Sequence, residues 1–332
     1  MSDPTAAPQG AHPTAEQLSA ALAEQFPHPW ATPTEAEAHW QESLAPELGR
    51  LTDAEFAAQY QRNWPVVADE SLYLNHLRLL PGGARALTGI RCRGLDPDRP
   101  FVDVVAVTPL PEKEAEWTEV ARQVAAPYAA FAPRHVRFTV PGPKAASLSL
   151  SRLPRTSHWD SVVVGAPVRE MNRRARVTHF GRVALRVPEN MGFYPRYRAE
   201  YDALYAGTPL HREYARVESE ADLAESLATG LLFEILVDGA WAGVASVYRD
   251  GGFGLRGFVV QEMFLGAAYR GQGLGSAAQQ HLAQALISPA GEGDVLYGTI
   301  HAGNLPALRA AQGAGRQRLA AQLFVGLDSA GS

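Results

Sequence analysis

The sequence is short of the features that mark membrane, disulfide-bonded and nucleic-acid-binding proteins. It has one cysteine, Cys92, in 332 residues, which excludes a disulfide framework and any metal site built from cysteines. No apolar run reaches the roughly 18 residues of a spanning helix, and Lys and Arg form no basic cluster for a nucleic acid. The N-terminus lacks the basic and apolar regions of a signal peptide, so we expect a cytoplasmic protein.

Motifs for other common chemistries are missing as well. The sequence contains no His-Glu-x-x-His pair, no calcium-binding loop and no nucleophile elbow, so we predict a site without a metal ion. Ser157, His158 and Asp160 have the residue types of a catalytic triad. Adjacent residues in a linker do not converge as a triad does, and we interpret this segment as a turn.

A glycine-rich turn between an apolar strand and a helix is the feature around which the chain is organised. Phe258–Leu265 is an apolar run that predicts a strand, and residues 276–286 have the pattern of a helix. Between them lie Gly271, Gly273 and Gly275, which lack a Cβ and therefore allow positive φ and close approach to a ligand. Amides at the start of a helix attract anions, so this turn is predicted to bind a phosphate group.

The spacing of the glycines distinguishes between the known kinds of phosphate site. A dinucleotide fingerprint requires Gly-x-Gly-x-x-Gly, but the third glycine comes one residue early and Ser276 stands in its place. A P-loop requires a lysine, and none is present in this turn. The run from Arg270 to Gly275 instead resembles the Arg/Gln-x-x-Gly-x-Gly signature of the GNAT superfamily of N-acetyltransferases. In that family the loop binds the pyrophosphate of acetyl-coenzyme A.

A second motif follows at the distance expected in that family. Residues 294–300 predict a strand, and the segment after it carries Asn304 and Ala307. This segment resembles the family's Asn-x-x-Ala/Ser helix, which ends in a glycine, here Gly315. The resemblance covers about 230–326 and extends from about 175. It implies an α/β protein, with the mixed sheet of the GNAT acyltransferase fold.

The resemblance implies which residues bind acetyl-coenzyme A, the expected co-substrate. The pyrophosphate would bind the glycine turn, and the pantetheine would pair with the backbone of the preceding strand. An amide of that strand would polarise the thioester carbonyl. The predicted cofactor-binding residues are Met263, Phe264, Leu265, Arg270, Gly271, Gln272, Gly273, Leu274, Gly275, Ser276 and Asn304.

The family's reaction is direct attack of an amine on the thioester, which requires a general base. Glu262 is the only carboxylate on the central strand, and burial there would raise its pKa towards neutrality. Strand alternation would place Gln261, Met263 and Leu265 on one face and Glu262 on the other, unless a bulge interrupts the strand. Without a bulge, Gln261 would orient a water in place of Glu262, whose alternative role is structural.

The group that protonates the departing thiolate is expected to differ from the family's usual residue. Many members have a tyrosine seven residues after the asparagine, where this chain has Ala311. The position after Gly315 is usually aromatic and is Arg316 here. His301 and Tyr297, on the preceding strand, are the substitutes, and His301 is the better placed. A purely structural role is the alternative for His301.

Four tyrosines at helical spacing lie in the first helix expected in the predicted catalytic domain. Tyr194, Tyr197, Tyr201 and Tyr205 are three or four residues apart and would share one helix face. We interpret them as core residues. Because the first helices of this fold frame the substrate cleft in the family, a place in the acceptor pocket is the alternative.

The N-terminal half is predicted to be a degenerate copy of the same fold. The strands and helix expected between residues 84 and 140 follow the order expected at 231–300. Where the glycine turn should follow, Thr108–Glu114 has prolines without amide donors, so this half is not expected to bind coenzyme A. An unrelated α/β domain is the alternative. We predict a disordered tail at 1–12, an N-terminal domain at 13–170 and a catalytic domain at 171–332.

These patterns together predict an N-acetyltransferase that moves an acetyl group from acetyl-coenzyme A to a primary amine. The acceptor amine would lie on a small molecule or, as the second choice, on a protein. The alternative is a non-catalytic acyl-coenzyme A sensor or scaffold, which Ala311 and the alternation at Glu262 would fit. We expect no nucleic-acid or membrane partner, and a monomer or homodimer.

Overall fold

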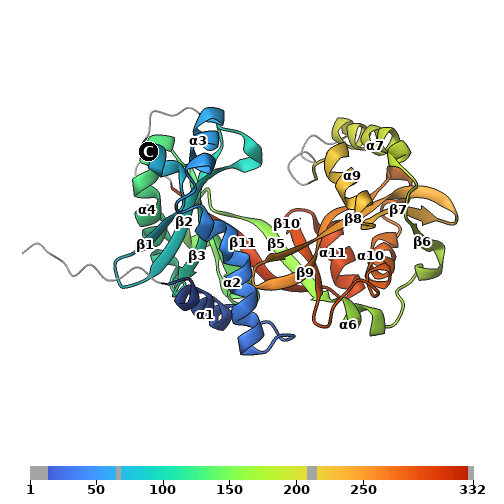
Figure 1. The fold of residues 1–332 in the computed structure, drawn as a ribbon, viewed down its shortest axis with the longest axis horizontal. Coiled ribbons are helices and arrows are strands. Elements are labelled where there is room, and N and C mark those ends of the chain that lie inside the picture. The colour runs from blue at the N-terminus through green and yellow to red at the C-terminus, as the bar shows by residue number, and fades with distance from the viewer. Residues whose placement is uncertain (1–13, 65–68, 208–214, 328–332) are drawn as a thin grey trace, which may run out of the picture. The chain divides into compact units, whose positions relative to one another are not determined.

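The computed structural model describes residues 14–64, 69–207 and 215–327, so the tail predicted to be disordered at 1–12 lies outside the described residues. The chain divides into two compact units. Unit 1 comprises residues 1–159, 252–254 and 322–332, and unit 2 comprises 160–251 and 255–321. Each unit combines β-strands with flanking helices, which confirms the predicted α/β class (Figure 1). In the described segments, no helix has both the length and the apolar character needed to cross a membrane.

Unit 1 opens with three helices whose first turns are capped by side chains. Thr14, Thr32 and Asp53 each accept a hydrogen bond from an amide of the turn that follows, which satisfies a donor that the helix leaves unpaired. The buried faces of the first two helices include Leu22 and Trp40. The three helices are α1 (Ala15–Gln25), α2 (Pro33–Gly49) and α3 (Ala54–Asn63).

The sheet of unit 1 has the strand order β1-β2-β3-β4. The first two pairs are antiparallel, and the β3–β4 pair is parallel and connected through helix α4. A crossover helix is what a parallel pair requires, whereas antiparallel neighbours are joined by short turns. The elements are β1 (His76–Leu79), β2 (Arg85–Cys92), β3 (Pro100–Thr108), α4 (Glu114–Ala125), β4 (His135–Pro141) and α5 (Gly142–Ser147).

The sheet of unit 2 has the strand order β5-β10-β9-β8-β7-β6. Its strands are β5 (His158–Pro167), β6 (Val183–Arg186), β7 (Leu232–Val237), β8 (Ala240–Gly252), β9 (Leu255–Leu265) and β10 (Val295–His301). Its helices are α6 (Val168–Arg173), α7 (Tyr194–Gly207), α9 (Glu220–Ala228), α10 (Leu274–Ala285) and α11 (Leu305–Ala314). Strand β11 (Gln317–Gly326) contributes residues to both units, and one end of β5 and of β8 also falls in unit 1.

Short 3-10 segments connect several of these elements. They lie at Glu70–Tyr73, Arg93–Leu95, Ala126–Phe131, Leu150–Arg152, Phe180–Arg182, Met191–Phe193 and Ala267–Tyr269. The last of them precedes the glycine turn of unit 2. The interpretation of residues 157–160 as a turn is wrong, because β5 begins at His158. His158–Asp160 alternates along an extended strand and cannot converge as a triad.

Unit 1 repeats the succession of elements found in unit 2. In unit 1, three paired strands β1, β2 and β3 lead to helix α4 and then to β4, which is parallel to β3. In unit 2, three paired strands β7, β8 and β9 lead to helix α10 and then to β10, which is parallel to β9. The predicted repetition of one fold in the two halves of the chain is therefore present in the structure.

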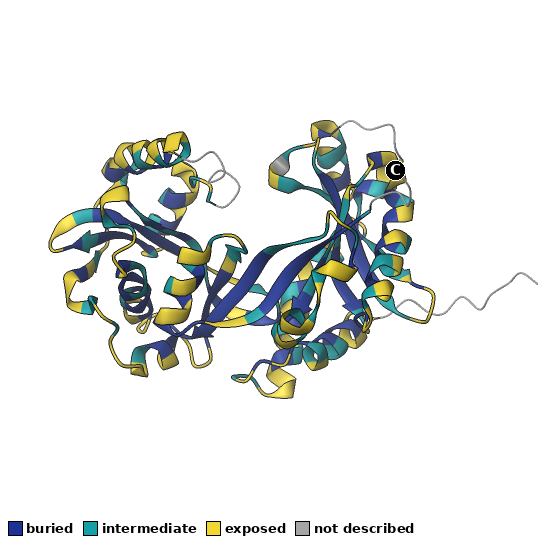
Figure 2. Ribbon diagram, turned by 180° about the vertical axis from the view of Figure 1, so that it is seen from behind, coloured by how far each residue is buried: buried dark blue, intermediate teal, exposed yellow. Residues whose placement is uncertain are grey.

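Helices cover both faces of the sheet in unit 2. On one face, Phe258 and Leu296 pack with Leu282 of α10 and with Leu286, the residue that caps its C-terminus. On the other, Phe264 packs with aromatic residues of α7 and with Leu223 of α9. Figure 2 shows the strands largely buried between helices whose outer sides are exposed. Residues of β9 therefore lie between two different helical layers, and the direction of each side chain decides which layer it contacts.

Candidate active site

Strands β9 and β10 of unit 2 separate part of the way along their length. Their parallel ladder consists of Gly257–Val295, Phe258–Leu296 and Val259–Tyr297, although β9 continues to Leu265 and β10 to His301. Beyond the ladder, β10 stays paired with β5 as far as His301. The facing backbone edges of the two strands are therefore not paired with each other after Val259. Such an open edge can bind an extended ligand that carries amide groups.

The side chains of β9 change their alternation at the same place. Val260 packs on the α10 side, and so does Met263, although residues three apart on a regular strand face opposite sides. Gln261 and Glu262, which lie between them, both contact residues on the α7 and α9 side. The expectation that Gln261 shares a face with Met263 is wrong. The strand has the interruption that the bulge alternative required, and Glu262 lies on the face opposite α10.

Glu262 is buried in a pocket made by tyrosines of α7. Its Oε2 accepts hydrogen bonds from the hydroxyls of Tyr197 and Tyr201, and its Oε1 accepts one from the amide of Met263 at 2.8 Å. Burial raises the pKa of Glu262 to about 7, although these three hydrogen bonds oppose the shift. A carboxyl group with a pKa near neutrality can both accept and release a proton under physiological conditions.

Gln261 belongs to a polar network beside this pocket. Its Oε1 accepts hydrogen bonds from Ser226 at 2.7 Å and from Ser246 at 3.0 Å, so α9 and β8 both hold its side chain. Glu218 is half-buried, and burial raises its pKa although a hydrogen bond from Gln261 acts in the opposite direction. The amide of Glu218 also donates to the hydroxyl of Tyr197 at 3.0 Å. The network therefore connects Gln261 to the tyrosines around Glu262.

The glycine turn has the backbone conformation that its sequence predicts. Gly271 and Gly273 have φ of +73° and +75°, in the left-handed region that side chains rarely adopt. Gly273 is the N-cap of α10, and no side chain caps this helix. The first amides of a helix have no partner within it, so those of α10 remain available to a ligand. Gly271, Gln272 and Gly273 are exposed, which suits a phosphate approaching from solvent.

The side chains around the turn hold its shape. Arg270 Nε donates to the carbonyl of Leu265 at 2.6 Å, and Gln272 Nε2 donates to that of Ala268 at 2.7 Å. Ser276 Oγ donates to the carbonyl of Ala310 at 3.0 Å and so connects α10 to α11. Asn304 Oδ1 accepts from the amide of Ala307 at 3.3 Å and caps α11. In this structure these polar residues position the backbone around the turn.

The backbone of Met263–Leu265 is partly used within the protein itself. The amide of Met263 donates to Glu262, and the carbonyl of Leu265 accepts from Arg270. A Cβ at Gly243 of β8 would lie 1.9 Å from the carbonyl oxygen of Phe264, so only glycine permits this approach of β8 to β9. Neighbouring residues of a strand direct their backbone groups to opposite sides. The backbone groups of Phe264 therefore point towards β8. Those of Met263 and Leu265 point to the opposite edge of β9, from which β10 has separated.

The predicted substitutes for the missing tyrosine lie on β10. His301 is at its end, where Nδ1 accepts a hydrogen bond from the amide of Gly303 at 3.0 Å. Tyr297 is buried and donates to the carbonyl of Asp250 at 3.3 Å, and burial raises the pKa of its hydroxyl. Ala311 packs with Val162, Val164 and Leu308, an apolar setting with no proton to donate. The structure does not bring His301 into contact with Glu262, because they lie on diverging strands.

Unit 1 has a filled groove at the place where unit 2 is open. The β3–β4 ladder ends at Val104–Phe138, and β3 continues to Thr108. Beyond the ladder, Gln25 of α1 donates to the carbonyl of Val107 at 2.9 Å and accepts from the amide of Leu110 at 2.8 Å. The cavity there has a volume of only about 10 Å³ and is lined by Leu22, Phe26, Trp40, Val104, Val105, Ala106, Val107 and Thr139.

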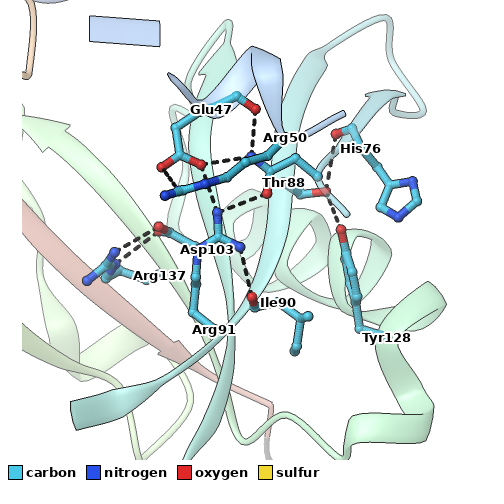
Figure 3. Close-up of polar contacts among 10 residues, drawn as sticks. Glu47, Arg50, His76, Thr88, Ile90, Arg91, Asp103, Tyr128 and Arg137 are labelled. Carbon is cyan, nitrogen blue, oxygen red and sulfur yellow. Dashed lines mark hydrogen bonds and ion pairs between the residues drawn. The ribbon is translucent and has the colours of Figure 1, made fainter. Parts of the chain in front are cut away.

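Unit 1 also has a carboxylate on its central strand, but this carboxylate is paired with arginine. Asp103 accepts two hydrogen bonds from Arg137, at 3.0 and 2.8 Å (Figure 3). Burial alone would raise the pKa of Asp103, but the charges of Arg137, Arg91 and Arg50 outweigh it and lower the pKa. Glu47 forms ion pairs with Arg50 and Arg91 in the same region (Figure 3). These paired charges have the character of a structural network.

Comparison with known proteins agrees with this geometry. Residues 193–315 match the model of the Acetyltransferase (GNAT) family. This segment is a GNAT acetyltransferase domain. Among solved structures, a GCN5-related N-acetyltransferase from Sphaerobacter thermophilus is 14% identical, covers 86% of this chain and 93% of its own, and has a TM-score of 0.50. At that identity the likeness shows the fold alone.

Two further structural matches extend over most of the chain. A GNAT-family acetyltransferase from Colwellia psychrerythraea is 12% identical and covers 86% of this chain and 98% of its own, with a TM-score of 0.48. A tandem GNAT protein from the clavulanic acid biosynthesis pathway is 13% identical, and the match covers 85% of this chain and 98% of that protein, with a TM-score of 0.39. No curated protein matches the sequence.

Sequence reasoning missed several residues of the GNAT domain's site. Tyr197 and Tyr201 were interpreted as core, and both are buried, but their hydroxyls also hold Glu262. Their spacing of four residues showed that they share a helix face, without showing what that face contacts. Ser226 and Ser246 carried no signal, because isolated serines occur throughout the sequence.

Proposed function

We propose that unit 2 transfers an acetyl group from acetyl-coenzyme A to a primary amine, by direct attack of the amine on the thioester. The observation that carries this proposal is Glu262, which is buried beside the separated strands, is held by tyrosines without a cationic partner among the described residues, and has a pKa of about 7. A neutral amine loses a proton as its C–N bond forms, and a carboxylate of this pKa can accept it.

The residues present fit coenzyme A. The uncapped start of α10 and the positive φ of Gly271 and Gly273 provide amides for a pyrophosphate. The edge of β9 at Met263 and Leu265 suits the amide-containing pantetheine arm. When bound, acetyl-coenzyme A supplies the activated acetyl thioester. The protein's own contribution is to orient both substrates, to accept the amine proton at Glu262, and to hold Glu262 through Tyr197 and Tyr201.

A covalent acetyl-cysteine intermediate finds no support in this chain. Burial raises the pKa of the Cys92 thiol to about 11, whereas a nucleophilic cysteine requires a lowered pKa. Cys92 also ends β2 in unit 1, whereas Glu262 and the glycine turn belong to unit 2. These observations favour direct transfer. The polar cluster of the partly buried Gln261 with the buried Glu262 and Tyr201 likewise favours an enzyme over an acyl-coenzyme A sensor, which would need an apolar cavity for the acyl chain.

Calorimetric titration with acetyl-coenzyme A, followed by thiol release against a panel of amines, tests the proposal. We expect binding, and turnover with at least one class of amine. Small diamines and amino sugars should be included together with peptides that have a free N-terminus. Absence of acetyl-coenzyme A binding would show that the glycine turn is only a structural turn. The sensor would be favoured if the wild type bound acetyl-coenzyme A tightly but turned over no amine, and if Glu262→Gln bound acetyl-coenzyme A equally well.

A further inference from the structure

Arg316, the residue immediately before β11, is a buried cation with no acidic partner in the part of the chain that the structure describes. It is 3% exposed, and its Nη1 donates to Gln279 Oε1 at 3.2 Å while its Nη2 donates to the carbonyl of Val164 at 3.0 Å. Both acceptors are neutral. Its Nε is buried and has no hydrogen-bond partner among the residues that the structure describes. A buried polar group left unsatisfied in a folded protein calls for an explanation, and a catalytic role is one of them.

Within residues 14–64, 69–207 and 215–327, no acidic side chain pairs with Arg316. The groups facing it are Gln279 from α10, Val164 from β5 and Gly298 from β10. The side chain of Arg174 packs on the preceding Gly315 and adds a second cation nearby. Burial alone lowers the pKa of Arg316 to about 9, with no contribution from an acid, so the guanidinium is still protonated at neutral pH. An unpaired buried charge costs several kcal/mol.

Arg316 lies where β9 and β10 begin to separate. Gly298 is the first residue of β10 after the end of the β9 ladder. A Cβ placed on Gly298 would be 3.4 Å from Arg316 Nη2 and 3.4 Å from the Cβ of Val260. These are ordinary contact distances, so the guanidinium packs beside the backbone of β10 at the point where the strands part. Glu262 and Tyr297 lie on the other face of these strands, towards Tyr201 and Asp250.

We propose that Arg316 stabilises the negative charge that forms on the sulfur of coenzyme A when the acetyl group leaves. This inference rests on the proposed acetyl transfer. In that reaction a C–N bond forms, the C–S bond breaks and its electron pair goes to sulfur, while the amine proton goes to Glu262. Arg316 transfers no proton. Its fixed charge in a buried site lowers the energy of the thiolate, and the thiolate supplies the counter-charge that the guanidinium lacks.

The proposal is tested by binding, without any need for the acceptor amine. Coenzyme A and desulfo-coenzyme A, which has no thiol, are titrated into the protein at about pH 6.5 and about pH 8.5. If Arg316 stabilises the thiolate, the bound thiol has a lowered pKa, and binding releases a proton. The affinity for coenzyme A relative to desulfo-coenzyme A should then rise about fivefold or more over this interval. Other ionising groups, including Glu262, affect both ligands and cancel in the ratio.

Three variants identify the source of the effect. Arg316→Met should abolish the rise, Arg316→Lys should retain part of it, and Arg318→Met, at an exposed position two residues further on in β11, should behave as the wild type. If the wild type binds both ligands tightly and its ratio of affinities does not change with pH, the proposal is overturned without any variant. A pH-dependent rise of this ratio that persists in Arg316→Met would also overturn it. If neither ligand binds the wild type, the proposed acetyl transfer fails first, and the role of Arg316 fails with it.

Discussion

Units 1 and 2 have the same succession of strands and helix, but they treat the edge of their central strand in opposite ways. In unit 2, β10 separates from β9 after Val259 and no longer pairs with its edge. In unit 1 the corresponding part of β3 is occupied by Gln25 of α1, whose side-chain amide binds Val107 and Leu110. Buried backbone groups need partners, so a strand edge must be filled from within the protein or by a ligand. The same succession of elements therefore leaves this edge open in one unit and fills it in the other.

The carboxylates of the two central strands differ in the same sense. Asp103 is neutralised by Arg137, which lowers its pKa, whereas Glu262 has only tyrosine and amide donors, and burial raises its pKa. A paired carboxylate keeps its charge at all physiological pH values and stabilises its unit. An unpaired, buried carboxylate can exchange a proton. The comparison shows that the presence of an acid on a strand says less about function than the charge of its partners.

The largest expected effect is on turnover, and it separates the two carboxylates. Glu262→Gln removes the proton acceptor while keeping the shape of the side chain, so kcat should fall by about 10²- to 10⁴-fold. Affinity for acetyl-coenzyme A should change little, because Glu262 lies outside the glycine turn. Asp103→Asn is the matched control and should leave kcat unchanged. Thiol release with an accepted amine measures both, and equal losses in the two variants would contradict the assignment of Glu262.

The next effect concerns the glycine turn, which unit 1 lacks. Gly273→Glu places a negative charge at the start of α10 and forces a side chain into a left-handed conformation. Because repulsion between like charges costs several kcal/mol, acetyl-coenzyme A affinity should fall by at least about a hundredfold. Gly83→Glu in unit 1, with a φ of +83° and open space around it, introduces the same strain and charge elsewhere. Calorimetry should show wild-type affinity for that control, and retained affinity in Gly273→Glu would refute the assignment of the turn.

A third effect is the opposite pH dependence of stability at the two carboxylates. The pKa of Glu262 is raised from 4.5 to about 7, so its folded form holds a proton that the unfolded chain releases. Stability from this group is complete below pH 4.5 and is lost as pH rises to about 7, by about 3 kcal/mol in all. The pKa of Asp103 is lowered, so its contribution is complete above the unfolded pKa of 3.8 and is lost as pH falls.

Denaturant unfolding of three proteins between about pH 3 and about pH 8 measures this difference. Relative to wild type, Glu262→Gln should become more stable as pH rises from about 4.5 to about 7, and the difference should level off above that. Asp103→Asn should be destabilised at neutral pH, and this penalty should shrink on acidification. The same pH trend in both variants would show that the two sites do not differ in the way that their partners indicate.

The smallest expected effect tests the filled groove of unit 1. Gln25→Ala leaves the carbonyl of Val107 and the amide of Leu110 without their partner, which should cost about 1–3 kcal/mol of unfolding free energy. Affinity for acetyl-coenzyme A should not change, because the missing glycine turn prevents unit 1 from binding it. A gain of a second binding site in calorimetry would instead mean that Gln25 is the only obstacle in unit 1.

Much of the fold of unit 2 could be predicted from the sequence, because its signals are local. The glycines of the turn, the apolar strand before it and the helix after it follow from conformational freedom and periodicity within some thirty residues. The prediction that Thr108–Glu114 cannot form such a turn also rests on local chemistry. Signals of this kind fail where a segment changes its role through distant pairing, as at His158–Asp160, which pairs as part of β5.

The sequence by itself predicted the class of site, through the glycine spacing and the single acid on the central strand. Only the tertiary structure decided the direction of Glu262, because alternation along a strand cannot reveal a bulge. It also decided that Tyr197 and Tyr201 hold Glu262, that Gln25 fills the groove of unit 1, and that Arg316 is buried without a counter-charge. These contacts join residues tens to more than a hundred positions apart. Burial and pairing between such residues arise from packing, which no local pattern in the chain records.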